Sequence, residues 1–476
     1  MTTHKLFLNG EWVDTGTYRD VIDPGTGKPF ARMCATDRDG VRTALEHAES
    51  ARAGWASMTA MKRADILLAA AQELERRRDE LAKTITMENG KPYKQSNGEV
   101  LMTIDHLRWF AEEARRAYGR IVPHQADGKR HLIMKRPIGV TACIAPWNFP
   151  LVLSARKVAP ALAAGCPVIL KPASQTPVCA VLFAECLEKA GIPKGVFQLV
   201  SGKASDIGDE LLENPTCRKI SFTGSTEVGK DLIRKSAETV TKLSLELGGH
   251  APVLVFSDAD MEKAVDGALI TKFRNTGQSC IAANRIYVEE SMYEAFLKRF
   301  GEKASQLKVG YGLEQDVDIG AIVNKEGLDT ALAHVKNAID AGARLICGGE
   351  PAETESGYFL KPTVLADVPS NAECMIEETF APVAPVASFK TEEEAIRMAN
   401  DTRYGLAAYA YTSDLNRAFR LAESLEAGTI GINDAVPSTS NCPFGGVKES
   451  GIGRELGSEG LDAFMETHHV SLGGIE

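Results

Sequence analysis

The chain has 476 residues, 44% of them hydrophobic and 25% charged, with a formal net charge of −10. A chain of this length predicts two or three domains, because one hydrophobic core rarely grows so large. The negative charge, with no basic stripe in the sequence, argues against nucleic acid as a partner. No apolar run approaches the ~20 residues of a membrane helix or follows a signal-peptide pattern, so we expect a cytoplasmic protein.

The first part of the chain predicts helices after a short extended segment. Apolar residues recur at helical spacing over 61–89, and Asn89-Gly90 is a typical helix end. A second amphipathic helix is expected over 99–118. The run 130–137 is typical of a strand that stands apart from the pattern following it.

From residue 140, short apolar runs alternate with helical stretches, first to about 224 and again from about 252 to 445. One helix is expected to begin at Thr176-Pro177 and to end at Gly191. The alternation predicts parallel sheets with helices on both faces, whose ligands bind at the carboxyl ends of the strands. The segment from about 458 ends in a further strand-like run.

The ten cysteines include no C-x-x-C pair, so zinc-ligand spacing is missing and we expect no metal site. Two nucleotide-binding patterns are also incomplete. There is no G-x-G-x-x-G, and residues 224–230 begin a P-loop that Asp231 breaks where a hydroxyl should hold magnesium. The Gly224-Ser225 turn could still face a pyrophosphate, or Ser225 could simply cap the following helix.

Six short polar motifs stand out along the chain. Taken singly, each has an ordinary structural explanation, since a Cys after a polar turn is often an inert core residue and a Glu at a strand end is often solvated. In chain order they are Pro146-Trp-Asn-Phe-Pro150, Lys171-Pro-Ala-Ser174, Glu246-Leu-Gly-Gly-His250, Phe273-Arg-Asn-Thr-Gly-Gln-Ser-Cys280, Glu377-Glu-Thr-Phe-Ala-Pro382 and Pro443-Phe-Gly-Gly-Val-Lys448.

Together, and in this order, the motifs resemble those of the aldehyde dehydrogenase superfamily over essentially the whole chain. The resemblance implies an α/β fold of three domains. They are a cofactor-binding parallel-sheet domain (1–117 and 138–248), an α/β catalytic domain (249–457) and a small β oligomerisation domain (118–137 and 458–476). It further implies a homodimer or homotetramer, and a dinucleotide site without the glycine fingerprint.

The resemblance also implies catalytic roles for three residues. Cys280 matches the nucleophile that adds to an aldehyde and then carries the acyl group as a thioester. The Asn148 amide, with the backbone N–H of Cys280, matches the oxyanion donors. Glu246 matches the general base that activates water to hydrolyse the thioester. The hydride would pass to NAD or NADP.

Ten residues match family positions around the dinucleotide. Lys171 and Glu378 match residues that hold ribose hydroxyls. At Ser174, members that prefer NAD often carry Glu, which would repel a 2′-phosphate, so the Ser implies that NADP is tolerated. The set is Trp147, Lys171, Pro172, Ala173, Ser174, Gly224, Ser225, Leu247, Glu378 and Phe380.

Within the superfamily, the chain resembles succinate-semialdehyde dehydrogenases most closely. Arg156, Arg274 and Ser438 match the positions that hold the substrate carboxylate in that group. Each Arg alone could instead form a structural ion pair. The loop 431–442 departs from the usual pattern, so glutarate semialdehyde, 2-oxoglutarate semialdehyde and sulfonated aldehydes stay open as substrates.

Two other functions are weighed. An enzyme that passes the acyl group to coenzyme A has less need of a water-activating Glu, so the Glu246 motif argues against it. A non-enzymatic relative that keeps the fold would tend to lose the nucleophile or the base, and Cys280, Glu246 and Asn148 are all present.

Overall fold

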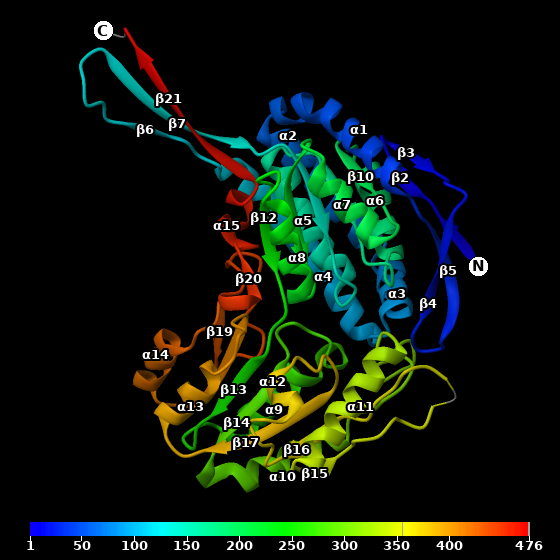
Figure 1. Ribbon diagram of the computed structural model, residues 1–476, viewed down its shortest axis with the longest axis vertical. Coiled ribbons are helices and arrows are strands. Elements are labelled where there is room, and N and C mark those ends of the chain that lie inside the picture. Colours follow the sequence, from blue (N-terminus) through cyan, green and yellow to red (C-terminus); the bar gives the residue numbers. More distant parts are fainter. Residues whose placement is uncertain (355, 475–476) are drawn as a thin grey trace.

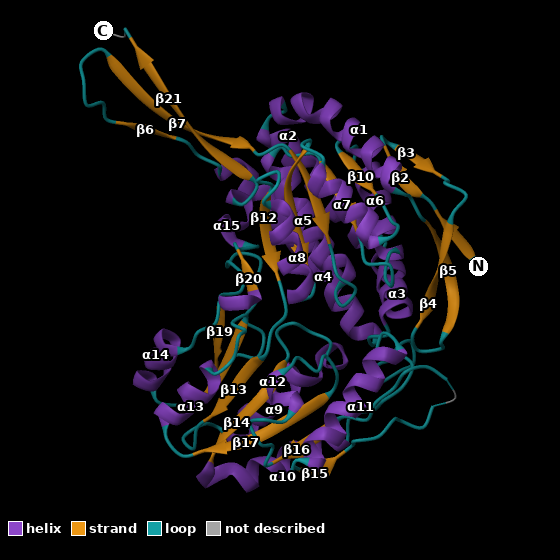
Figure 2. Cartoon of the chain, viewed as in Figure 1, coloured by secondary structure: helices purple, strands orange, loops and turns teal. Residues whose placement is uncertain are grey.

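The computed structural model describes residues 1–354 and 356–474. Two α/β bodies face one another, and a long narrow β-sheet projects from the first of them (Figure 1). Each body is built around its own sheet, with helices packed on it (Figure 2). This confirms the α/β class with parallel sheets and a separate small β unit. No helix in the described ranges is long and apolar enough to cross a membrane.

The first sheet has eight strands, and its five central strands run parallel. Its central strands are buried on both faces, as expected for continuous apolar runs. In spatial order the strands are β20 (Gly451–Ile452), β12 (Lys242–Glu246), β11 (Cys217–Thr223), β8 (Val140–Ile144), β9 (Val168–Lys171), β10 (Phe197–Leu199), β2 (Leu6–Leu8) and β3 (Glu11–Val13).

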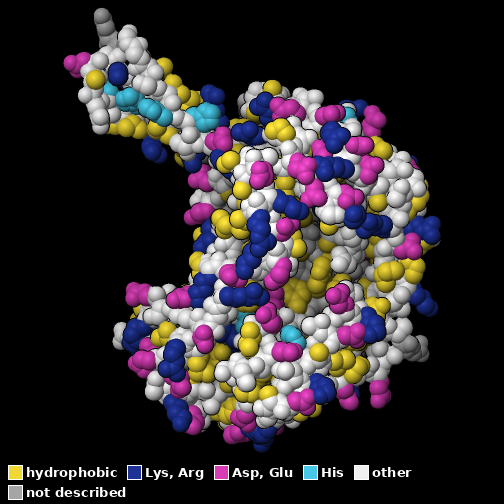
Figure 3. Space-filling view, in the orientation of Figure 1, with side chains coloured by type: hydrophobic (Ala, Val, Ile, Leu, Met, Phe, Trp, Pro, Cys, Tyr) yellow, Lys and Arg dark blue, Asp and Glu magenta, His cyan; other side chains and the backbone are white. Residues whose placement is uncertain are grey.

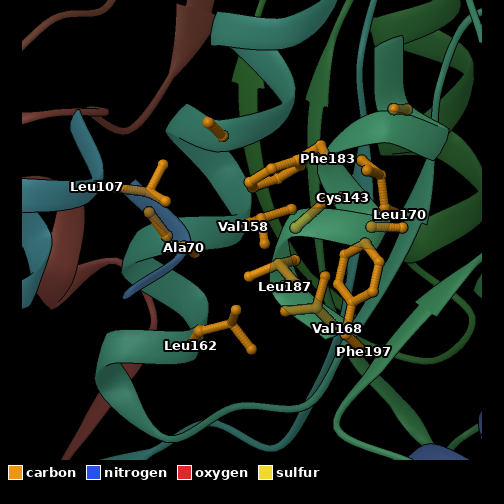
Figure 4. Close-up of a cluster of buried hydrophobic side chains, with 14 of the residues drawn as sticks. Ala70, Leu107, Cys143, Val158, Leu162, Val168, Leu170, Phe183, Leu187 and Phe197 are labelled. Atoms are coloured by element: carbon orange, nitrogen blue, oxygen red, sulfur yellow. The ribbon is translucent and has the colours of Figure 1, made fainter. Parts of the chain in front are cut away.

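Helices cover both faces of this sheet. On one face lie α1 (Arg38–Ser57), α7 (Ala204–Glu213) and α8 (Thr226–Ser236). On the other lie α5 (Pro150–Ala164) and α6 (Val178–Lys189), with α2 (Ala60–Arg76), α3 (Arg78–Asn89) and α4 (Tyr93–Glu113) stacked around them. Figure 4 shows the apolar core between α5, α6 and the sheet, where Val158, Phe183 and Leu187 meet Cys143 and Val168.

The predicted helices differ from the structure at two places. The helix expected over 61–89 is two helices, α2 and α3, which meet at Arg77. Its end is as predicted, since Gly90 adopts φ 93° after Asn89. The helix expected over 99–118 is α4, which begins earlier, at Tyr93, and ends at Glu113. Pro92 is its N-cap residue, and proline is common at the start of a helix. The helix expected from Thr176-Pro177 is confirmed as α6.

The second body carries a seven-stranded sheet that is parallel except at β15. Its strands, in spatial order, are β15 (Arg344–Cys347), β16 (Thr363–Ala366), β17 (Val383–Phe389), β14 (Ala283–Glu289), β13 (Ala251–Val255), β18 (Ala407–Tyr411) and β19 (Thr429–Ile432). Its helices are α9 (Met261–Phe273), α10 (Tyr293–Ser305), α11 (Lys325–Asp340), α12 (Glu373–Ile376), α13 (Glu392–Asn400) and α14 (Leu415–Ser424).

The strand predicted over 130–137 is confirmed as β7 (Lys129–Pro137). It pairs with β6 (Arg120–Val122) and with β21 (Met465–Gly473), which follows the short helix α15 (Gly457–Asp462). These three strands form the projecting sheet of Figure 1. The N-terminal extended segment is larger than expected. Besides β2 and β3, it forms a small sheet of β1 (Thr2–His4), β5 (Lys28–Cys34) and β4 (Tyr18–Asp23).

Candidate active site

Four loops meet along one edge of the first sheet, where β12, β11, β8 and β9 end. Their registers align Thr223 with Glu246, and Ile144 with Lys171. Two backbone hydrogen bonds tie neighbouring loops together, from Gly224 N to Glu246 O and from Ala145 N to Lys171 O, each 3.1 Å long. Parallel strands therefore bring four motifs that are distant in sequence into one row, as expected for a ligand site of this fold.

A cavity of about 230 Å³ opens at this edge, in the region between the two bodies where Figure 3 shows apolar side chains lining a hollow. Eight predicted site residues line it, together with three that were not predicted. The lining is Pro146, Trp147, Asn148, Thr223, Gly224, Ser225, Leu247, Gly248, Cys280, Glu378 and Phe380.

The Cys280 thiol reaches the cavity from the second body, after α9 and a short turn, η2 (Arg274–Gly277). Asn275 and Thr276 both adopt left-handed backbone angles, with φ 52° and 58°, and Gly277 follows at φ 73°. Such angles strain non-glycine residues by about 1–2 kcal/mol each, so surrounding contacts must hold this turn. Burial, reinforced by the charge of Glu378, raises the pKa of the thiol to about 12, whereas the charge of Arg156 lowers it. The resting thiol is therefore protonated at neutral pH.

The side chain of Asn148 lies beside Cys280 on the cavity wall. Its amide donates one long hydrogen bond, 3.3 Å, to the carbonyl oxygen of Gln278. Its Oδ1 has no hydrogen-bond partner among the described residues. The amide is thus weakly held. It can turn its N–H donors toward the oxygen of a substrate carbon that bonds to Cys280.

Glu246 ends β12 directly behind the cavity and is buried. Burial, together with the negative charge of Glu455, raises its pKa well above the ordinary value. Glu455 in turn binds Lys157, whose ammonium also donates to Thr223 Oγ1 at 2.5 Å. A carboxylate with a raised pKa is a better proton acceptor near neutral pH, which suits a general base.

The predicted cofactor residues fall into two groups. Trp147 and Phe380 form one wall of the cavity, with their rings edge to face and their centroids 5.3 Å apart. Gly224 and Ser225 form the opposite turn, where Ser225 Oγ accepts from Val228 N and caps α8. This confirms the capping interpretation of Ser225. The N-terminus of α8 also faces the cavity, an arrangement that suits a phosphate group.

The second cofactor group, residues 171–174, follows β9 next to the cavity but does not line it. Lys171 is buried, and its ammonium donates to Pro172 O at 3.2 Å. Burial and the charge of Arg19 lower the pKa of Lys171 to about 8. Pro172 is buried, while Ala173 and Ser174 are half-buried. Glu378, across the cavity, accepts from Gly249 N at 3.5 Å, and burial raises its pKa to about 8.

The two predicted substrate arginines lie in the same neighbourhood. The charge of Arg156 lowers the pKa of Arg274 and also that of Cys280, so all three groups are close. Arg156 is 8% exposed, and its Nε has no hydrogen bond within the described part of the chain. The nearest carboxylate oxygen, on Glu455, is 4.0 Å away. Ser438 is half-buried in the loop before Cys442, and no hydrogen bond of its side chain is seen in the described ranges.

Several residues of the site were not predicted. Lys157 and Glu455 form a buried pair behind Glu246, and Lys91 with Glu99 forms another behind Asn148. One signal was available for the first pair, since Arg156 and Lys157 are adjacent cations on an otherwise apolar helix, where charges are rarely buried without a partner. Glu455 and Glu99 have no such signal.

The chain is similar to several known proteins over nearly its whole length. The model of the aldehyde dehydrogenase family matches residues 12–470. The chain is 46% identical to succinate-semialdehyde dehydrogenase [NADP(+)] of Escherichia coli, over 98% of both chains. It is 45% identical to glutarate-semialdehyde dehydrogenase of Pseudomonas aeruginosa, over 99% of this chain and 98% of the other. The crystal structure of succinate-semialdehyde dehydrogenase from Burkholderia pseudomallei matches with a TM-score of 0.97 at 43% identity, over 99% of this chain and 98% of that one.

Proposed function

The chain belongs to the aldehyde dehydrogenase family, and we propose that it oxidises succinate semialdehyde, or a similar short anionic aldehyde, to the carboxylic acid with NADP or NAD. The observation that carries the substrate class is Arg156, a buried guanidinium whose Nε finds no hydrogen bond in the described ranges although it lies close to Cys280. A buried donor without a partner is costly, and a substrate carboxylate would satisfy it. The named relatives act on aldehydes with a second acidic end.

The cavity lining suits the nicotinamide and pyrophosphate parts of a dinucleotide. Trp147 and Phe380 supply apolar walls for a flat ring, and the α8 N-terminus at Gly224 and Ser225 supplies N–H groups for a pyrophosphate. Lys171 and Glu378 would hold ribose hydroxyls. When bound, the cofactor accepts the hydride of the reaction.

The reaction begins when the sulfur of Cys280 forms a bond to the aldehyde carbon. Its proton must first leave to solvent, because burial keeps the thiol protonated at rest. The carbonyl oxygen becomes an oxyanion, which the Asn148 amide and the Cys280 N–H stabilise; one such donor contributes about 2.7–4 kcal/mol. Loss of hydride from this carbon leaves a thioester on Cys280.

Hydrolysis of the thioester then requires one water. Glu246 takes a proton from that water, the oxygen bonds to the acyl carbon, and the C–S bond breaks. The proton then passes from Glu246 to the sulfur, which returns the thiol and frees the carboxylate. Lys157 and Glu455 lie behind Glu246 and set its charge environment, since the negative charge of Glu455 raises the pKa of Glu246 and the positive charge of Lys157 lowers it.

Domain roles and assembly form part of the same proposal. We assign cofactor binding to 1–117 and 138–248, catalysis to 249–457, and oligomerisation to 118–137 and 458–476. The sheet memberships support these bounds, except that β20 pairs with β12 of the first sheet. Assembly into a homodimer or homotetramer has support from apolar side chains exposed on the projecting sheet, among them Ile121 at 74% and Met134 at 39%.

A substrate panel tests the proposal. We would measure kcat/KM for succinate, glutarate and 2-oxoglutarate semialdehydes, a sulfonated aldehyde and butanal, with NAD and with NADP. The proposal expects an anionic aldehyde to be preferred over butanal, and expects Cys280→Ala to abolish oxidation while cofactor binding persists. Equal or better turnover of butanal would contradict the substrate class. Turnover by Cys280→Ala above a few per cent would contradict the mechanism.

A further inference from the structure

We infer that the buried ion pair of Lys91 and Glu99 positions the oxyanion donor Asn148 and acts through the backbone carbonyl of Asn148. The inference rests on the role proposed above for the Asn148 amide. Neither Lys91 nor Glu99 touches the cavity, so both would be positioning residues.

The ion pair is hydrogen-bonded directly to the loop that carries Asn148. Lys91 Nζ lies 2.7 Å from Glu99 Oε2 and also donates to Asn148 O at 2.7 Å. Both side chains are fully buried, with 0% exposure. A buried ion pair adds little net stability compared with apolar residues, so stability alone is a poor reason for its presence.

The same carboxylate fixes the chain on the other side of Asn148. Glu99 Oε1 accepts from Leu151 N at 2.9 Å and from Val152 N at 3.2 Å, in the first turn of α5. These two N–H groups have no partner within the helix, so the carboxylate caps it. Glu99 therefore orients α5, which begins two residues after Asn148 and carries Arg156.

The backbone of Asn148 is held by more hydrogen bonds than its side chain. Its carbonyl oxygen accepts three hydrogen bonds, from Lys91 Nζ at 2.7 Å, Asn275 Nδ2 at 2.8 Å and Asn89 Nδ2 at 3.4 Å. Among the residues described, its side-chain amide makes only the 3.3 Å bond to Gln278 O. The position of the donor thus comes from the carbonyl, and the amide stays available for the substrate oxygen.

The network also reaches the nucleophile turn. Asn275 donates to both Asn148 O and Gln278 O, each at 2.8 Å, and so joins the oxyanion loop to the turn before Cys280. Asn275 N donates to Gln95 Oε1 at 2.7 Å. Gln95 and Glu99 are one turn apart on α4. One face of α4 therefore contacts both catalytic loops and sets their separation.

The chain contains a matched control for a purely structural role. Glu88 is also 0% exposed, and its carboxylate also caps a helix, accepting from Val178 N at 2.7 Å and Cys179 N at 3.1 Å of α6. Within the described ranges, the hydrogen bonds of this carboxylate go to α6 alone and not to Asn148. Loss of Glu88 should cost stability without moving the oxyanion donor.

Double-mutant cycles test the inference. Lys91→Met, Glu99→Gln and Glu88→Gln are each made in the wild type and in Asn148→Ala, and kcat/KM for succinate semialdehyde is measured with active sites titrated. We expect Lys91→Met and Glu99→Gln to lower kcat/KM about 10- to 100-fold, since a misplaced catalytic group costs up to about 100-fold. In Asn148→Ala the same changes should have almost no further effect. The KM for the cofactor should stay near the wild-type value in Lys91→Met and Glu99→Gln. The control variant Glu88→Gln should keep nearly the wild-type activity per active site.

The outcomes separate this inference from the proposed function. If the losses in Lys91→Met and Glu99→Gln multiply with that of Asn148→Ala, the pair does not act through Asn148 and the inference is wrong. If Glu88→Gln shows the same loss and the same coupling, the effect is general destabilisation, which also overturns it. If Asn148→Ala keeps full activity, the proposed oxyanion role and this inference fail together. Glu99→Gln preserves the side-chain shape, so it serves where Lys91→Met does not fold.

Discussion

The backbone of Cys280 packs directly on Gly249, the second glycine after Glu246. A β-carbon on Gly249 would lie within 3.0 Å of the carbonyl oxygen of Cys280, closer than real β-carbons come to a backbone atom. The base motif and the nucleophile turn are therefore in backbone contact. Gly249→Ala should force the Cys280 turn to shift and should lower kcat/KM about 100-fold, the usual cost of displacing a catalytic group by about 1 Å.

Gly208→Ala is the control for that measurement. Gly208 lies in α7, and a β-carbon there would meet no atom within 4 Å. The change should leave kcat/KM unaltered and stabilise the protein by about 0.5–1 kcal/mol, since Ala favours a helix over Gly. Near-normal activity in Gly249→Ala would show that the turn can relax.

Glu246→Gln should separate acylation from hydrolysis. The amide keeps the shape of the side chain beside Gly445 but cannot take a proton from water. We expect a rapid burst of about one NADPH per active subunit, followed by slow turnover as the thioester accumulates. Stopped-flow absorbance measures the burst. A variant with no burst would place Glu246 before hydride transfer, as the acceptor of the Cys280 proton alone.

Cofactor preference should depend on Ser174. This side chain is half-buried beside Lys171, and a carboxylate in its place would repel a 2′-phosphate. We expect the wild type to use NADP, and Ser174→Glu to shift the ratio of kcat/KM values toward NAD. Ser174→Gln has a similar size without the charge and should shift the ratio less. If the wild type does not use NADP, other residues control this pocket.

Cofactor affinity should also depend on pH through Lys171. Burial and the charge of Arg19 lower the pKa of Lys171 to about 8, so the free enzyme holds a charged ammonium below that pH and loses it above. The KM for the cofactor should be level up to about pH 8 and rise beyond it. Lys171→Met should show a high KM at every pH, without this inflection. An unchanged inflection in the variant would assign it to another group.

The sequence predicted the arrangement of the loops better than it predicted their supports. Alternating strands and helices predicted parallel sheets with ligands at the carboxyl ends of their strands, and the parallel registers bring 146–148, 171–174 and 223–225 together at such ends. Lys91 and Glu99 were not identified, because charged residues in a turn or on an amphipathic helix are usually on the solvent side. Both are fully buried, since each serves as the other's counterion and both bind backbone groups. Such partners are close only in the folded chain, so periodicity cannot reveal them.

Arg156 should bind the anionic end of the substrate. Its guanidinium is 8% exposed, contacts the Phe444 ring at 4.8 Å, and leaves Nε without a hydrogen bond among the residues described. A charge-assisted hydrogen bond contributes roughly 1.5–3 kcal/mol, so Arg156→Ala should lower kcat/KM for succinate semialdehyde about 10- to 150-fold. Butanal has no carboxylate to bind and should be oxidised nearly as before.

Arg63 provides a matched control for the loss of a buried arginine. It is also 8% exposed and packs at the other end of α5, where its Nε donates to Ala163 O at 3.0 Å. Arg63→Ala should reduce the melting temperature and affect both aldehydes equally, because its partners are backbone carbonyls. Arg156→Ala should instead change the ratio of the two kcat/KM values. If Arg156→Ala lowers butanal and succinate semialdehyde oxidation by the same factor, Arg156 supports the fold beside Glu455, and the anion must be bound elsewhere.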